Sequence, residues 1–216
     1  MDLPRLFVLG AALTACALVV VLIAELRRHQ LLLALGKPAA STGFLLAGWG
    51  AGAMQSAYGQ VTFVALVFCF IGDVCLIARN KKAFLAGLVS FLLGHLGFAV
   101  AFGVRGIDLT VLGLTLVAML APALVIWRWL SPHVEPKMRA PVIAYIVVIS
   151  FMVACAAGNG WRTHALLPLI GAVLFFLSDI AVARNRFVKQ EVTNRLWGLP
   201  LYFTSVQLLA ATILER

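Results

Sequence analysis

Two aspartates lie inside apolar stretches long enough to cross a membrane: Asp73 in FCFIGDVCLIAR and Asp179 in LFFLSDIAVAR. Insertion scales put the cost of a carboxylate at the bilayer centre at ~2.5 kcal/mol or more. Two such residues in matching surroundings cost too much free energy to be explained by packing alone. The alternative to a chemical role is a structural one, in which each aspartate makes a hydrogen bond to a neighbouring helix. Paired carboxyl groups can divide general acid and general base work between them. We therefore expect the chemistry of this chain at Asp73 and Asp179.

A few other polar side chains share the apolar stretches. At a rise of ~1.5 Å per residue, counting from Arg79 and Arg184 puts both aspartates roughly 8 to 9 Å inside the membrane, and His95 deeper, at roughly 18 Å. The same count brings Tyr145 and Tyr202 to the layer of the aspartates, and Lys37 opens the second helix on that side. Each of these residues also has a structural alternative to a role in a site. His95 could be a core histidine bonded to a carbonyl, the tyrosines could be interfacial residues, and Lys37 could anchor its helix at the membrane surface. These groups predict a polar pocket in one half of the membrane.

The elements that must position these residues are membrane helices. Hydrophobic residues make up 63% of the 216 residues and charged residues 12%, which does not suit a soluble domain. Continuous apolar runs exclude a β-barrel. We expect a single all-α integral membrane domain over residues 1–216, a polytopic bundle of eight transmembrane helices. The predicted spans are about 4–24, 38–54 (with 31–35 as a front extension), 61–78, 84–104, 109–130, 140–157, 164–183 and 196–214.

The net charge of +9 follows the positive-inside rule and does not indicate nucleic acid. Four alternate connections carry 13 of the 17 Lys and Arg residues, and Arg5, Arg105, Arg162 and Arg216 fall on the opposite side. The prediction is a bacterial inner (cell) membrane protein with both termini outside. The pocket would then face the cytoplasmic leaflet, and the basic loops would contact anionic membrane lipids. The basic connections contain Arg27, Arg28, Lys37, Arg79, Lys81, Lys82, Arg128, Lys137, Arg139, Arg184, Arg186, Lys189 and Arg195.

The two aspartate segments resemble each other. FIGDVCLIARN and FLSDIAVARN share an aromatic residue, a small residue before Asp and a closing Ala-Arg-Asn, and each lies on the third helix of a four-helix half. Both halves would enter the membrane in the same orientation, which predicts a 4+4 parallel repeat about an axis along the membrane normal. Chance similarity between apolar helices is the alternative.

Several polar positions follow one another in a fixed order along the predicted helices: Lys37-Pro38, Gly72-Asp73, Gly94-His95, Tyr145, Ser178-Asp179, Tyr202 and Gln207. This order resembles the lysoplasmalogenase family of YhhN-like membrane proteins, and the likeness runs from about residue 30 to 210. The resemblance implies eight helices. It also implies hydrolysis of the vinyl ether bond of lysoplasmalogens, which gives a fatty aldehyde and glycerophosphoethanolamine or glycerophosphocholine.

Vinyl ether chemistry suits two carboxyl groups. Protonation of the β-carbon gives an oxocarbenium ion, which water attacks, and the hemiacetal then collapses, so no metal or cofactor is required. The sequence does not decide which aspartate is the acid; we expect Asp179 as proton donor and Asp73 as base, with His95 shuttling protons or binding the headgroup. The substrate would be a lysophospholipid, its phosphate at Lys37 and its tail among the apolar helices. Tyr145, Tyr202, Ser178 and Gln207 would complete the substrate-binding residues.

Other functions remain open on the sequence. A proton-coupled carrier uses paired intramembrane carboxylates equally well, although the polar groups lie on one side only. A non-catalytic membrane partner needs neither aspartate. A zinc hydrolase is disfavoured because only His95, of the four histidines, lies deep in the membrane, and none of the four cysteines forms a CxxC pair. The oligomeric state is unknown.

Overall fold

The computed structural model describes residues 3–78 and 80–215, and this part of the chain is built from helices without any strand. It contains eight helices long and apolar enough to cross a membrane. The predicted all-α bundle is therefore confirmed, and the chain is an integral membrane protein. In chain order the helices are α1 (Leu3–Leu26), α2 (Gln30–Gly50), α3 (Ala57–Cys75), α4 (Lys81–Arg105), α5 (Leu109–Leu130), α6 (Pro136–Thr163), α7 (Leu167–Ala183) and α8 (Val192–Ala211).

Polar caps set the starts of several helices. Ser56, Asn80 and Asp108 accept hydrogen bonds from the backbone N–H three residues further on, at 3.0, 2.8 and 2.9 Å. Each cap satisfies one of the amides that a helix leaves unpaired at its N-terminus. The helices α3, α4 and α5 can therefore begin directly after short connections.

Helix α2 begins earlier than the sequence predicted. The expected span began at Pro38 with Lys37 opening it, whereas α2 begins at Gln30 and places both residues about two turns inside. Proline lacks the N–H that would bond one turn back, but membrane helices tolerate this loss where neighbouring groups compensate. The prediction that Lys37 opens the second helix is wrong, because the apolar run 31–35 belongs to the same helix.

Helix α7 also extends further than its apolar run indicates. It continues without a break into a π-helical turn, η3 (Arg184–Val188), so Asp179 lies nine residues before the end of the helical segment. Asp179 lies beside His95, although the count from the basic residues put these two side chains in different layers.

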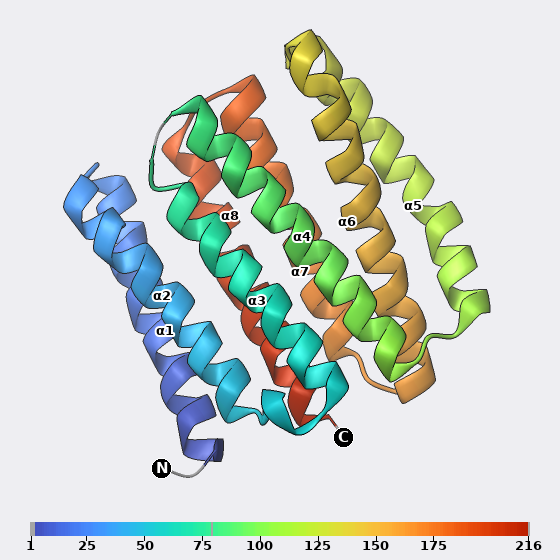
Figure 1. The fold of residues 1–216 in the computed structure, drawn as a ribbon. Coiled ribbons are helices and arrows are strands. Elements are labelled where there is room, and N and C mark those ends of the chain that lie inside the picture. The colour runs from blue at the N-terminus through green and yellow to red at the C-terminus, as the bar shows by residue number, and fades with distance from the viewer. Residues whose placement is uncertain (1–2, 79, 216) are drawn as a thin grey trace.

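The helices pack as four antiparallel hairpins, α1–α2, α3–α4, α5–α6 and α7–α8 (Figure 1). Between hairpins, α2 packs on α3 and α8, while α6 packs on α4 and α7. Helix α5 lies at the edge of the bundle and packs chiefly along α6. The main core fills the space between α2, α3, α4, α6, α7 and α8, with the fully buried Phe44, Phe98, Phe175 and Phe203 inside it.

One end of the bundle collects the basic connections. The α1–α2, α3–α4, α5–α6 and α7–α8 connections all lie at this end, and both termini lie at the other (Figure 1). We call it the basic end. Arg79 and Arg216, which belong to the same charge pattern, lie outside the described residues. The side of the membrane that this end faces, the host membrane and the 4+4 repeat stay predictions.

Glycines allow α3 and α4 to cross closely beside His95. A Cβ added at Gly72 would lie 2.7 to 2.8 Å from ring carbons of Phe91, and one at Gly97 would lie 2.9 Å from the Cβ of Ala65. Such separations are too short for real carbon atoms, so these positions need glycine. The crossing brings α4 near enough for His95 to reach the aspartate layer.

We expect Gly72→Ala to destabilise the protein by about 1 to 3 kcal/mol, because the added methyl group must displace Phe91. Thermal unfolding in detergent measures the change. Gly113→Ala is the control, since a Cβ there has nothing within 4 Å and alanine favours a helix. Equal melting temperatures for the two variants would contradict the tight crossing.

The topology prediction is checked with a pair of reporter fusions in a bacterial host. A green fluorescent protein inserted at Gln190, in the α7–α8 connection, should fluoresce, because the basic end is expected in the cytoplasm. The same reporter at the C-terminal end should stay dark, and alkaline phosphatase there should be active. The reverse pattern would overturn the predicted orientation.

Candidate active site

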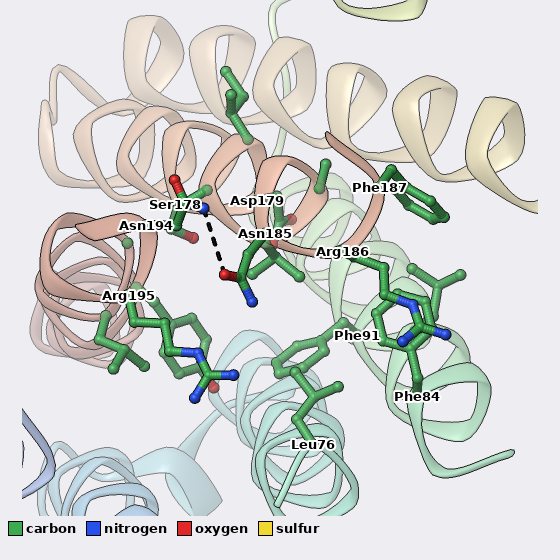
Figure 2. Close-up of a pocket in the computed structure, with 18 of the residues that line it drawn as sticks. Leu76, Phe84, Phe91, Ser178, Asp179, Asn185, Arg186, Phe187, Asn194 and Arg195 are labelled. Carbon is green, nitrogen blue, oxygen red and sulfur yellow. Dashed lines mark hydrogen bonds between the residues drawn. The ribbon is translucent and has the colours of Figure 1, made fainter. Parts of the chain in front are cut away.

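A single cavity of about 370 Å³ opens at the basic end and reaches both intramembrane aspartates. Its walls come from α2 to α8, with Glu25 near the end of α1 at its rim. Figure 2 shows its rim, where Asn185 lies between Arg186 and Arg195 and Asp179 lies further in. Most of the residues singled out from the sequence line this one cavity: Lys37, Asp73, Tyr145, Ser178, Asp179 and Tyr202.

Asp73 is held through one oxygen. Its Oδ2 accepts a hydrogen bond from the Tyr202 hydroxyl on α8 at 2.6 Å and from the Ser41 hydroxyl on α2 at 2.7 Å. The side chain is 2% exposed. Because both donors among the described residues use Oδ2, Oδ1 is the oxygen left for a molecule in the cavity.

Asp179 is also held through one oxygen, but by different groups. Its Oδ2 accepts a hydrogen bond from the Tyr145 hydroxyl on α6 at 2.9 Å. The Nε2 atom of His95 on α4 lies 3.4 Å from the same oxygen. Asp179 is the more accessible of the two acids, with 16% of its side chain exposed.

The orientation of His95 is fixed from within its own helix. The Nδ1 atom lies 2.6 Å from the carbonyl oxygen of Phe91, one turn earlier. A carbonyl only accepts hydrogen bonds, so Nδ1 carries a proton and donates it. The ring packs against Phe175, with centroids 4.3 Å apart, and is fully buried. The remaining nitrogen, Nε2, therefore faces Asp179 either as an acceptor or as the second N–H of an imidazolium.

The two aspartates have partners from corresponding helices. Ser41 and Tyr145 belong to the helix that precedes the aspartate in each half, α2 and α6. Tyr202 and His95 belong to the last helix of the opposite half, α8 and α4. Each acid is thus completed by the other half of the chain. The correspondence breaks at one place, where a phenol faces Asp73 and an imidazole faces Asp179.

Lys37 brings a cation into the cavity beside Asp73. It lies one turn before Ser41 on α2, with 9% of its surface exposed. The charges of Asp73 and Glu25 act on its ammonium group. Among the described residues none accepts a hydrogen bond from it, whereas Glu25 pairs with Arg195 at 2.5 Å. Lys37 is therefore placed inside the site and not at the surface.

The rim of the cavity is stabilised by a polar network at η3. The buried Asn194 donates to the Lys189 carbonyl at 2.8 Å and to Asn185 Oδ1 at 3.4 Å, and it accepts a hydrogen bond from Arg184. The guanidinium of Arg186 lies 4.3 Å from the centre of the Phe84 ring. These contacts order the segment that carries the cationic rim.

Two predicted residues hold other positions. Ser178 lines the cavity, but its hydroxyl donates to the Phe175 carbonyl at 2.7 Å, within its own helix. Gln207, on α8, lies away from the cavity lining, and its buried amide has no hydrogen-bond partner among the described residues. The exposed His29, His133 and His164 lie at helix ends, and over residues 3–78 and 80–215 no three potential metal ligands come together.

Sequence reasoning missed Ser41, Glu25 and Arg195. Ser41 carried a signal, because a residue four positions after Lys37 lies on the same helix face. Glu25 and Arg195 lie 170 positions apart in the chain, and only the packing of α1 against α8 brings them together. The bond from His95 to the Phe91 carbonyl had no signal beyond helical spacing.

Comparison with known proteins agrees with this architecture. The model of the YhhN family matches residues 7–213. Bovine lysoplasmalogenase TMEM86A is 30% identical over 159 residues, which cover 71% of this chain and 65% of the bovine protein. Human lysoplasmalogenase TMEM86B is 32% identical over 162 residues, 73% of this chain and 65% of the human protein.

The mouse protein of that name is 33% identical over 154 residues, 70% of this chain and 62% of the mouse protein. The chain thus spans slightly less than two thirds of the length of these relatives. No solved structure matches it. Because the family model covers nearly the whole chain, from α1 to η4 (Thr212–Leu214), this membrane protein belongs to the YhhN family.

Proposed function

We propose that this chain is a lysoplasmalogenase-like hydrolase. It would cleave the vinyl ether bond of lysoplasmalogens, giving a fatty aldehyde and glycerophosphoethanolamine or glycerophosphocholine. The observation that carries the proposal is the meeting of carboxyl groups from α3 and α7 at one cavity, each held through a single oxygen. Relatives named as lysoplasmalogenases support the same activity. Acid–base hydrolysis of this bond needs a proton donor and a carboxylate, which these two groups supply.

Asp179 is the proton donor in this proposal. Asp179 lines the cavity, and because Tyr145 and His95 lie against Oδ2, Oδ1 is left for the substrate. With Nδ1 bonded to a carbonyl, the ring of His95 can take up or release a proton only at Nε2, beside the acid. Imidazole is the side chain that exchanges protons near neutral pH. His95 would therefore hold the Asp179 carboxyl group in place and could exchange a proton with it between turnovers, which makes it a positioning residue.

Asp73 is the carboxylate that faces the cationic intermediate. Hydroxyl groups of Ser41 and Tyr202 donate to it, and the ammonium of Lys37 acts on it electrostatically. Donors and a cation stabilise the ionised form of a carboxyl group. Asp73 would stabilise the oxocarbenium ion and accept a proton from the attacking water.

The proton inventory of this cycle closes without an outside reagent. Asp179 gives its proton to the β-carbon, and Asp73 takes one from water as the hemiacetal forms. In the collapse, the hemiacetal hydroxyl returns a proton to Asp179, and Asp73 protonates the departing glyceryl oxygen. Both carboxyl groups end as they began, so a second turnover can follow.

The substrate headgroup would lie toward the basic end. Lys37 lies one helical turn, ~5.4 Å, from Ser41 in that direction. In a lysoplasmalogen the phosphate is separated from the vinyl ether oxygen by the three glyceryl carbons, a similar span. A phosphate near Lys37 and Arg195 would thus place the reacting bond between the aspartates.

Replacing either acid should remove the activity. We expect Asp179→Asn and Asp73→Asn each to lower fatty aldehyde release roughly 100-fold or more, because an amide supplies neither the proton donor nor the base. The measurement uses purified protein in detergent with a lysoplasmalogen and EDTA present. Asp108→Asn is the matched control, since Asp108 caps α5 outside the cavity and asparagine caps equally well.

Two outcomes would count against the proposal in different ways. A wild-type protein that releases no aldehyde from ethanolamine or choline lysoplasmalogens would refute the function. Full activity in both Asn variants would refute the assigned roles. The carrier alternative would be favoured by a different result. In that case proteoliposomes would take up a small molecule together with protons, the Asn variants would lose this uptake, and no aldehyde would form.

The tautomer of His95 is directly observable. We expect nitrogen NMR of histidine-labelled protein to show Nδ1 protonated, and Asp179→Asn to alter the Nε2 resonance selectively. A background that leaves His95 as the single histidine simplifies the spectrum: His29→Asn, which keeps a helix cap, His133→Gln, and His164→Asn, which suits its φ of 55°. A neutral ring protonated at Nε2 alone would contradict the proton path.

A further inference from the structure

The cavity has an apolar arm on the side of α4, α5 and α6. Besides the polar groups, its lining includes side chains from the basic-end halves of α4, α5 and α6. We call this part the apolar arm, and it is formed by Phe84, Leu88, Ile126, Leu130, Val142 and Ile146. Because the arm and the aspartates belong to one cavity, a molecule that fills both must join a polar end to an apolar one.

The walls of the arm belong to two hydrophobic clusters. The main core includes Phe91 and Ile149, which also line the cavity. A second cluster contains Leu130 and Val142, and Ile126 and Ile146 pack against it. The cavity is thus lined here by side chains of both clusters, and an alkyl chain in the arm would contact both.

The bundle is less closed beside α5 than beside α1. Helix α1 packs along α2 and also against α8, which covers that flank. Helix α5 packs along α6, and over the described residues it makes no comparable contact with α4. Its outward side chains, such as Leu124 and Val125 at 60% and 67% exposure, face the lipid. At the basic end, α4 and α5 both contribute to the apolar arm, through Phe84 and Leu88 and through Ile126 and Leu130.

We propose that the apolar arm binds the single hydrocarbon chain of the substrate. Val142 and Ile146 then determine which chain lengths are accepted. This inference rests on the proposed function, since it assigns the tail of that substrate. Lys37 and Arg195, on α2 and α8, complement an anionic headgroup, and the arm on α4, α5 and α6 complements one alkyl chain.

The test narrows the arm without touching the acids. Val142→Trp and Ile146→Trp should lower kcat/KM at least about tenfold for a long-chain lysoplasmalogen, because the indole ring excludes methylene groups of the chain from the arm. A short-chain substrate should change by less than about twofold. Ile143→Trp is the matched control, because this neighbour is 43% exposed and faces lipid. Val142→Ala, which widens the arm, should shift preference toward longer chains.

A second measurement works without turnover. A saturated ether lysophospholipid with a photoreactive diazirine at its chain end should label peptides containing residues 126–130 or 142–146 of the wild type. Labels confined to outward residues of α5, or an unchanged chain-length profile in all arm variants, would overturn the inference. If no lysoplasmalogen is cleaved but the arm is labelled, the proposed function fails while the tail site stands.

Discussion

The cost of placing two carboxyl groups in a membrane governs this structure. Each acid must find hydrogen-bond donors on neighbouring helices, because no water reaches the hydrocarbon core to supply them. Asp73 finds them on α2 and α8. Asp179 finds one on α6 and lies 3.4 Å from Nε2 of His95 on α4. The contacts made by Tyr202 and His95 join the first and second halves of the chain. The acids therefore contribute to the fold as well as to the site.

The two carboxyl environments share a plan but differ in one group. Both have a hydroxyl donor from the preceding helix and a ring from the last helix of the other half. For Asp73 that ring is the phenol of Tyr202, and for Asp179 it is the imidazole of His95. We propose that this plan reflects the parallel repeat, and that the difference divides the acid and base roles. An imidazole exchanges protons at neutral pH, whereas a phenol mainly donates a hydrogen bond.

The sequence predicted those features that depend on composition and spacing. Apolar length indicated eight helices, and the isolated polar residues in them indicated Asp73, Asp179, Tyr145 and Tyr202, which all line the cavity. The start of α2 was predicted wrongly, because a proline that ends most helices in water is accommodated inside this one.

Other features depend on tertiary packing, which leaves no local pattern. Ser41 became visible as a partner only when α2 and α3 were placed together, and Gln207 lies away from the cavity although the family resemblance had grouped it with the site. The apolar arm is a space lined by apolar side chains, and in the sequence these residues have the same pattern as ordinary core residues. Apolar patterning reports which helices form but not where their packing is incomplete.

The bond between His95 and the Phe91 carbonyl has one more consequence. A backbone carbonyl is present whatever side chain stands at position 91, so no single substitution there can delete the acceptor. The imidazole would keep its tilt while the surrounding aromatic residues vary in size. Substitutions around the ring can therefore change the shape of the cavity while Nε2 of His95 keeps its position beside Asp179.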